Sequence, residues 1–210
     1  MKLYYRNIHG HYDLVPKGGN VIERVVEIKD TLGLIPYFKV LPNFDVKIIL
    51  DFENIEPVGE LVAFLKAQFE TGKQLSGILI TEGKFLNAFF DLVRKQDFNI
   101  PFWLDKGAWA KADDYVKGKA SGVIINFRQK LGEISRKKFI VLNSEYKDKF
   151  IWQFSFENED DFGFFEKNKR KISLFDAITA DFGVSVSKDL RFKIQRFNNL
   201  FQNIMKDNAK

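Results

Sequence analysis

The hydrophobic positions of this chain form short apolar runs, and five of them end in a polar cluster. The runs are Val46–Phe52, Gly77–Ile80, Ile100–Leu104, Gly122–Phe127 and Phe139–Leu142. Consecutive apolar positions over this length are typical of strands that are covered on both faces. Because parallel sheets place their ligand sites at the carboxyl ends of the strands, the polar clusters predict where a site lies.

Helical spacing of apolar residues alternates with these runs. One predicted helix follows Pro57 and ends at Gly72, the next carries Phe85, Leu86, Phe89, Phe90 and Val93, and a weaker one lies around Trp109–Val116. A further helix is predicted to begin at Asn20, because Asn20 with Glu23 matches a capping box. Lys2–Arg6 is predicted to form a short strand.

Two short connections limit how many strands are parallel. Only a few residues separate Ile35–Leu41 from Val46, and Phe139–Asn143 from Phe150–Phe156. A parallel crossover needs about a dozen residues or more, so each pair is predicted to be an antiparallel hairpin. The fold class expected is therefore α/β, with a mixed, mostly parallel sheet flanked by helices in a Rossmann-like or toprim-like order. A small irregular (β/α) barrel is the alternative.

The chain changes character after Phe156. We expect residues 1–156 to form the α/β domain, and residues 157–210 to form a helical region that packs on this domain or on a partner. Ser173 with Asp176 predicts a short helix that ends near Gly183. The last helix carries a coiled-coil-like stripe, made of Leu190, Ile194, Phe197, Phe201 and Ile204.

Composition excludes several classes of function. The chain has no Cys, so disulfides, thiolate nucleophiles and zinc–cysteine sites are excluded. No signal-peptide core and no membrane-spanning run is recognised, which predicts a cytoplasmic protein that has no membrane partner. The net charge of +5 permits nucleic-acid binding without requiring it.

One strand end resembles a motif of nucleic-acid enzymes. Ile78–Lys84 reads ILITEGK and leads into a predicted helix. This is similar to the first motif of toprim domains, which act on nucleic acids with Mg²⁺, and the resemblance implies that Glu82 serves as a base or metal ligand. The later strand that would supply an Asp-x-Asp pair ends instead in Asn126-Phe127-Arg128.

The same residues permit other chemistry. Asp51 or Glu53, followed by Glu82-Gly83-Lys84, resembles the acidic residue and Glu-x-Lys of restriction-type nucleases. Asp51, Glu82, Asp105 and Lys84 are therefore the candidate catalytic residues, and Asp51, Glu53 and Glu82 are the candidate Mg²⁺ ligands. The alternative is that the acidic residues cap helices at strand-to-helix turns.

The sequence completes no catalytic constellation, so it leaves open whether the protein is an enzyme. The leading hypothesis is a non-catalytic, cofactor-free protein that associates with a partner or with itself in a larger complex. The partner-binding or nucleic-acid-binding residues would be the basic run Lys167, Lys169, Arg170 and Lys171 and the stripe residues Leu190, Ile194, Phe197 and Phe201. One alternative is a Mg²⁺-dependent nucleic-acid-processing enzyme. The other is a small-molecule enzyme whose site lies at the strand carboxyl ends.

Overall fold

The computed structural model describes residues 1–24, 47–51, 63, 66–67, 75–83, 86–95, 98–126 and 149–207. The chain divides into two compact units. Unit 1 combines Met1–Gly19 with Ile125–Lys210, and unit 2 is Asn20–Ile124.

Unit 2 contains a parallel sheet with helices beside it. Its strands, in spatial order, are β2 (Asn20–Arg24), β3 (Lys47–Asp51), β4 (Leu75–Ile80), β5 (Phe102–Asp105) and β6 (Gly122–Asn126). Its described helices are α3 (Leu86–Lys95), α4 (Lys106–Lys111) and α5 (Asp114–Lys119). The predicted strands at Val46, Gly77, Ile100 and Gly122 are confirmed, and so is the helix that carries Phe89 and Phe90.

The weak helix predicted around Trp109 is two helices. The first ends at Lys111, with Ala112 as its C-cap. Asp113 begins the second, because its carboxylate accepts a hydrogen bond of 2.8 Å from the Val116 N–H. This bond, together with the 2.7 Å ion pair to Arg94, holds the pKa of Asp113 below its usual value.

The helix predicted to begin at Asn20 is wrong, because these residues form β2. Val21 and Ile22 are adjacent and both fully buried, so both faces of this segment are covered, as in a sheet interior. β-Branched side chains favour that environment. Asn20 and Glu23 match a capping box only as a local sequence pattern. The burial of this segment by the rest of the protein favours a strand more strongly than that pattern favours a helix.

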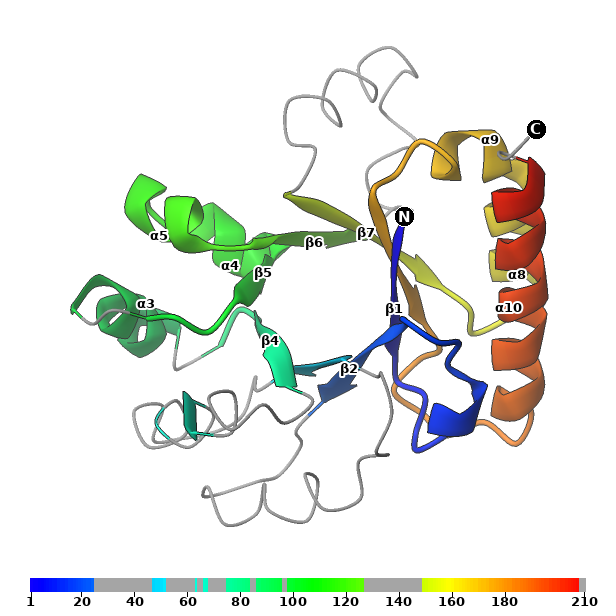
Figure 1. Ribbon diagram of the computed structural model, residues 1–210, viewed down its shortest axis with the longest axis horizontal. Coiled ribbons are helices and arrows are strands. Elements are labelled where there is room, and N and C mark those ends of the chain that lie inside the picture. The colour runs from blue at the N-terminus through cyan, green and yellow to red at the C-terminus, as the bar shows by residue number, and fades with distance from the viewer. Residues whose placement is uncertain are drawn as a thin grey trace. The chain divides into compact units, whose positions relative to one another are not determined.

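Unit 1 is a parallel sheet in which β8 lies between β7 and β1. The strands are β1 (Lys2–Arg6), β7 (Phe150–Ser155) and β8 (Ala177–Asp181). The helices are α8 (Glu159–Lys167), α9 (Lys169–Ile172) and α10 (Leu190–Asp207), with a 3-10 turn η1 (Tyr12–Leu14). Figure 1 shows α8 and α10 side by side along this sheet.

The short helix predicted from Ser173 to Gly183 is also wrong. Ser173 ends α9, and Ala177–Asp181 is β8, whose first four residues are all buried. Burial of consecutive residues requires cover on both faces, which a central strand provides. The region 157–210, expected to be helical, therefore supplies a strand as well as three helices.

An aromatic core lies between the unit 1 sheet and its helices. Phe156 and Phe197 contact each other with ring centroids 4.8 Å apart, and both are fully buried. The rings packed around them are Tyr5, Phe162, Phe165 and Phe182. The predicted stripe of α10 therefore packs on its own unit, with Leu190, Ile194 and Phe197 buried.

The α/β fold class is confirmed, and every strand pairing among the described residues is parallel. Parallel strands flanked by helices also fit the barrel alternative. Both predicted hairpins involve residues outside the described ranges, namely Ile35–Leu41 and Phe139–Asn143. Within the described ranges, no helix is both long enough and apolar enough to span a bilayer.

Candidate functional site

One face of the unit 1 sheet is polar toward the carboxyl ends of its strands. Side chains alternate between the two faces of a strand. Tyr5 and Phe154 contact α10 and α8, respectively, and Trp152 stacks on Phe175, in the segment between α9 and β8. The strand register therefore places a second set on the opposite face: Tyr4, Arg6, Gln153, Ser155, Thr179 and Asp181. Parallel strands are usually apolar on both faces, so a set of polar side chains on one face indicates a candidate functional site.

A chain of hydrogen bonds links three of these residues, Arg6, Gln153 and Asp181, to Asn7 at the carboxyl ends of β1, β7 and β8. Asp181 accepts from the Gln153 amide at 2.8 Å and from the Asn7 amide at 2.7 Å. Gln153 in turn accepts from the Arg6 guanidinium at 3.4 Å. We call Arg6, Asn7, Gln153 and Asp181 the polar cluster; it lies where parallel sheets hold their ligands.

Two hydroxyl groups lie deeper on the same face. Burial raises the pKa of Tyr4 to about 12, so its phenol stays protonated at neutral pH. Thr179 is fully buried, and its hydroxyl has no hydrogen-bond partner among the described residues. The polar face thus extends from the half-buried cluster into the interior.

The loops after the three strands meet above the cluster. Asn7 and His9 adopt left-handed backbone conformations, with φ of 57° and 45°. The His9 ring nitrogen Nε2 lies 3.3 Å from the carbonyl of Gly183. Left-handed backbone at residues other than glycine is costly and concentrates at functional sites, which is consistent with a site here.

Position 183 requires a glycine. Its φ is 83°, and a Cβ added there would lie 2.8 Å from the Cγ of Glu157, in the loop after β7. Its N–H donates to Asp181 at 3.1 Å. The close approach of these two loops therefore depends on a residue without a side chain.

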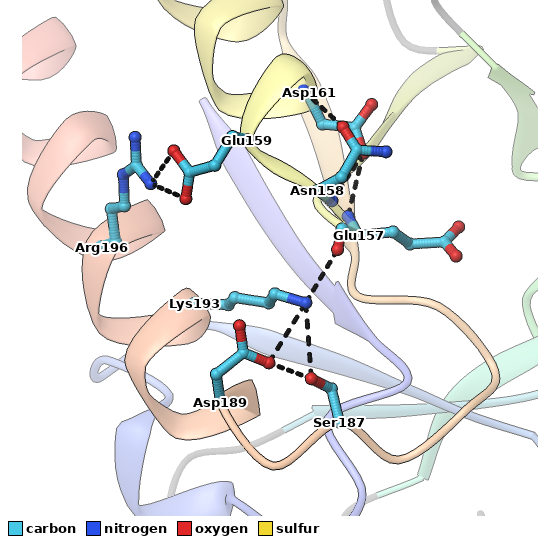
Figure 2. Close-up of polar contacts among 8 residues, drawn as sticks. All are labelled: Glu157, Asn158, Glu159, Asp161, Ser187, Asp189, Lys193 and Arg196. Atoms are coloured by element: carbon cyan, nitrogen blue, oxygen red, sulfur yellow. Dashed lines mark hydrogen bonds and ion pairs between the residues drawn. The ribbon is translucent and has the colours of Figure 1, made fainter.

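A network on α10 ties the same loops in place (Figure 2). Lys193 donates to the Glu157 carbonyl at 2.8 Å and pairs with Asp189 at 3.3 Å. The hydrogen bond from Ser187, with help from Lys193, holds the pKa of Asp189 below its usual value. One lysine thus joins the loop after β7 to the loop after β8.

The start of α8 is fixed independently. Asn158 and Asp161 form a reciprocal capping box, and the buried Asp161 carboxylate accepts from the N–H groups of Glu157 and Asn158 (Figure 2). Arg196 makes two contacts of 2.6 Å with Glu159 and lies 4.3 Å from the centre of the Phe162 ring. The loops beside the polar cluster are therefore preorganised.

Three of the acidic residues predicted from sequence, Asp51, Glu82 and Asp105, belong to unit 2, and two of them meet. Asp105 caps α4 by accepting from the Ala108 N–H at 2.7 Å, and it lies 3.4 Å from the Glu82 N–H. The exposed Glu82 carboxylate pairs with Lys111 at 2.5 Å. These contacts agree with the capping alternative for Asp105.

Of the other candidate residues in this group, the structure describes only Asp51. Asp51 ends β3, in register with Leu79 of β4. Glu53 and Lys84 lie outside the described residues. No three potential metal ligands cluster in the part of the chain that the structure describes, and Mg²⁺ binding by Asp51, Glu53 and Glu82 stays a prediction.

Replacement of Asp105 tests whether this residue caps α4. Asp105→Ala is expected to lower the free energy of unfolding by about 1 kcal/mol, because the Ala108 N–H loses its acceptor. Asp105→Asn keeps an acceptor oxygen and is expected to cost only a few tenths of this amount. Urea unfolding followed by circular dichroism measures both, and equal losses would contradict the capping role.

The predicted binding residues all lie in unit 1. Lys167 ends α8, while Lys169, Arg170 and Lys171 belong to α9, and all of these except Lys171 are exposed. Of the four predicted stripe residues, Leu190, Ile194 and Phe197 are buried and Phe201 is partly exposed. The basic run is therefore accessible to a partner, and most of the stripe is used internally.

Sequence reasoning missed the polar cluster. The segment Ala177–Phe182 shows the same signal as the five runs, since apolar residues lead to Asp181 and Gly183 follows. The alternation at Gln153 and Ser155 gave a second indication of a polar face.

The comparisons with known proteins support the fold. No protein-family model matches this chain, and no curated protein matches it. The crystal structure of RipC from Yersinia pestis matches with a TM-score of 0.51 and 12% identity, over 96% of this chain and 94% of that one. The structure of Sph3 from Aspergillus clavatus, in complex with GalNAc, matches with a TM-score of 0.51 and 11% identity, over 93% and 96%. This chain is thus similar to both proteins in fold over nearly its whole length.

Proposed function

We propose that this protein binds a small hydroxyl-rich ligand, of the carbohydrate class, at the carboxyl ends of β1, β7 and β8. The observation that carries the proposal is the connected chain from Arg6 through Gln153 and Asp181 to Asn7. Amides both donate and accept hydrogen bonds and a carboxylate accepts them, so together they match sugar hydroxyl groups.

Two further observations support this proposal. The cluster is half-buried and its loops are held by the Lys193 network, so little ordering is needed on binding. A protein of similar fold, Sph3, was crystallised with GalNAc. A single carboxylate lies in the chain of hydrogen bonds, whereas glycoside hydrolysis generally uses a pair, so the proposal is one of binding.

Nuclear magnetic resonance tests this proposal through side-chain amides. We expect GalNAc, GlcNAc or a neutral hexose, at about 1–10 mM, to shift the amide signals of Asn7 and Gln153 in a saturable manner. Gln195 and Asn199, exposed on α10, serve as reference signals that should not move. Equal shifts at all four residues would contradict the proposal. So would the absence of a shift at Asn7 and Gln153 with each of these sugars.

Association with a partner is a second proposal, favoured by one observation. The segment that leads into α10, and the first turn of this helix, expose large apolar side chains: Val184 and Phe192 are each 62% exposed, and Val186 is 73% exposed. Such side chains are common at protein interfaces. They form the surface on which association would rest. The accessible basic run lies near the opposite end of α10 (Figure 1), so it is a separate surface, on which nucleic-acid binding would rest.

A further inference from the structure

A pocket of about 410 Å³ lies in unit 1, beside β1 and α10. Its walls include Leu3 of β1, Pro16 of the following loop, and Phe201 and Met205 of α10. It lies toward the amino end of β1, whereas the polar cluster lies at the carboxyl end of that strand. The volume falls within the range of about 300–1,000 Å³ that is usual for small-molecule sites.

Two polar side chains of the pocket wall, Tyr5 and Asn198, are already engaged in hydrogen bonds. The Tyr5 hydroxyl donates to the Asn198 side-chain oxygen at 2.6 Å, and the Asn198 amide donates to the Leu14 carbonyl at 2.8 Å. Burial also raises the pKa of Tyr5, so its phenol stays neutral. A ligand in this pocket therefore meets chiefly apolar contacts along the wall.

The charged residues of the lining are both basic. Lys17 comes from the loop before β2 and Lys206 from the last turn of α10, and no carboxylate is among the described lining residues. The loop that carries Lys17 turns tightly, because Gly18 has a φ of 80° and a Cβ on Gly19 would lie 2.7 Å from a methyl group of Val15. The Gly18-Gly19 pair therefore permits the tight turn of the loop that forms this part of the pocket wall.

We infer that this pocket binds a small amphipathic anion, specifically a medium-chain carboxylate. The apolar walls take the hydrocarbon chain, and the exposed ammonium group of Lys206 takes the carboxylate. This site is separate from the polar cluster, so either proposal can fail without the other.

Calorimetry with decanoate tests the inference, below the concentration at which decanoate forms micelles. We expect one decanoate to bind per chain, and to bind several-fold more tightly than decanol or decyltrimethylammonium. Lys206→Glu should weaken decanoate binding by about three- to tenfold, as expected for reversing one exposed charge. Gln202→Trp, which adds a ring at the pocket from an exposed position of α10, should abolish binding of both decanoate and decanol.

Lys188→Glu is the matched control, because it changes the net charge equally at an exposed residue outside the pocket. It should leave decanoate affinity unchanged. The inference is overturned if decanoate binds no better than decanol, if Lys188→Glu weakens binding as much as Lys206→Glu, or if Gln202→Trp leaves binding intact.

Discussion

Phe197→Ala is expected to lower the free energy of unfolding by about 3–5 kcal/mol, the usual cost of removing a fully buried aromatic ring. Phe197 is completely buried, and its ring contacts Phe156, Phe165 and Tyr5 with centroid distances of 4.8, 5.6 and 5.7 Å. Alanine leaves a cavity at the centre of this aromatic core. Unfolding in guanidinium, followed by circular dichroism, should show a large fall in the transition midpoint.

Phe192→Ala is the control, on the same helix and with the same atoms removed. Phe192 is exposed, so this change should alter the free energy of unfolding by no more than about 0.5 kcal/mol. Light scattering on both variants also tests association. Loss of a multimer in Phe197→Ala, with no change in the midpoint, would contradict the internal role of this ring.

The fold class could be predicted because burial on both faces leaves a clear mark in the sequence. The runs at Val46, Gly77, Ile100 and Gly122 are apolar at consecutive positions, and each is a parallel strand. The spacing from Leu190 to Ile204 likewise predicted α10, since apolar residues that recur every three or four positions over this length are typical of a helix with one buried face.

Local signals failed where distant contacts decide the structure. Asn20 and Ser173 each match a helix-start pattern, yet the segments after them are buried on both faces by elements remote in sequence. The polar cluster was missed for the same reason. Arg6, Gln153 and Asp181 converge only because β1 and β7 both pair with β8, and a single sequence does not reveal that pairing.

Asp181→Asn is expected to cause the largest loss of ligand binding, at least tenfold in affinity. The carboxylate accepts from Asn7, from Gln153 and from the Gly183 N–H. An asparagine there presents an NH₂ group to one of these donors, and two donors cannot bond. If the Gln153 amide flips to accept from the new asparagine, its NH₂ group faces the Arg6 guanidinium, which is also a donor. One pair of opposed donors therefore remains.

The same change should cost about 1–3 kcal/mol of stability, because one half-buried donor loses its partner. Asp160→Asn is the control, because it removes the same charge from an exposed residue of α8 outside the cluster. It should leave the sugar affinity unchanged and cost only about 0.5 kcal/mol of stability, from a weaker interaction with the helix dipole. Titration of GalNAc or the best-binding sugar against each variant gives the affinities, and thermal unfolding gives the stabilities. Sugar binding by Asp181→Asn with wild-type affinity would show that the ligand site is not at the polar cluster.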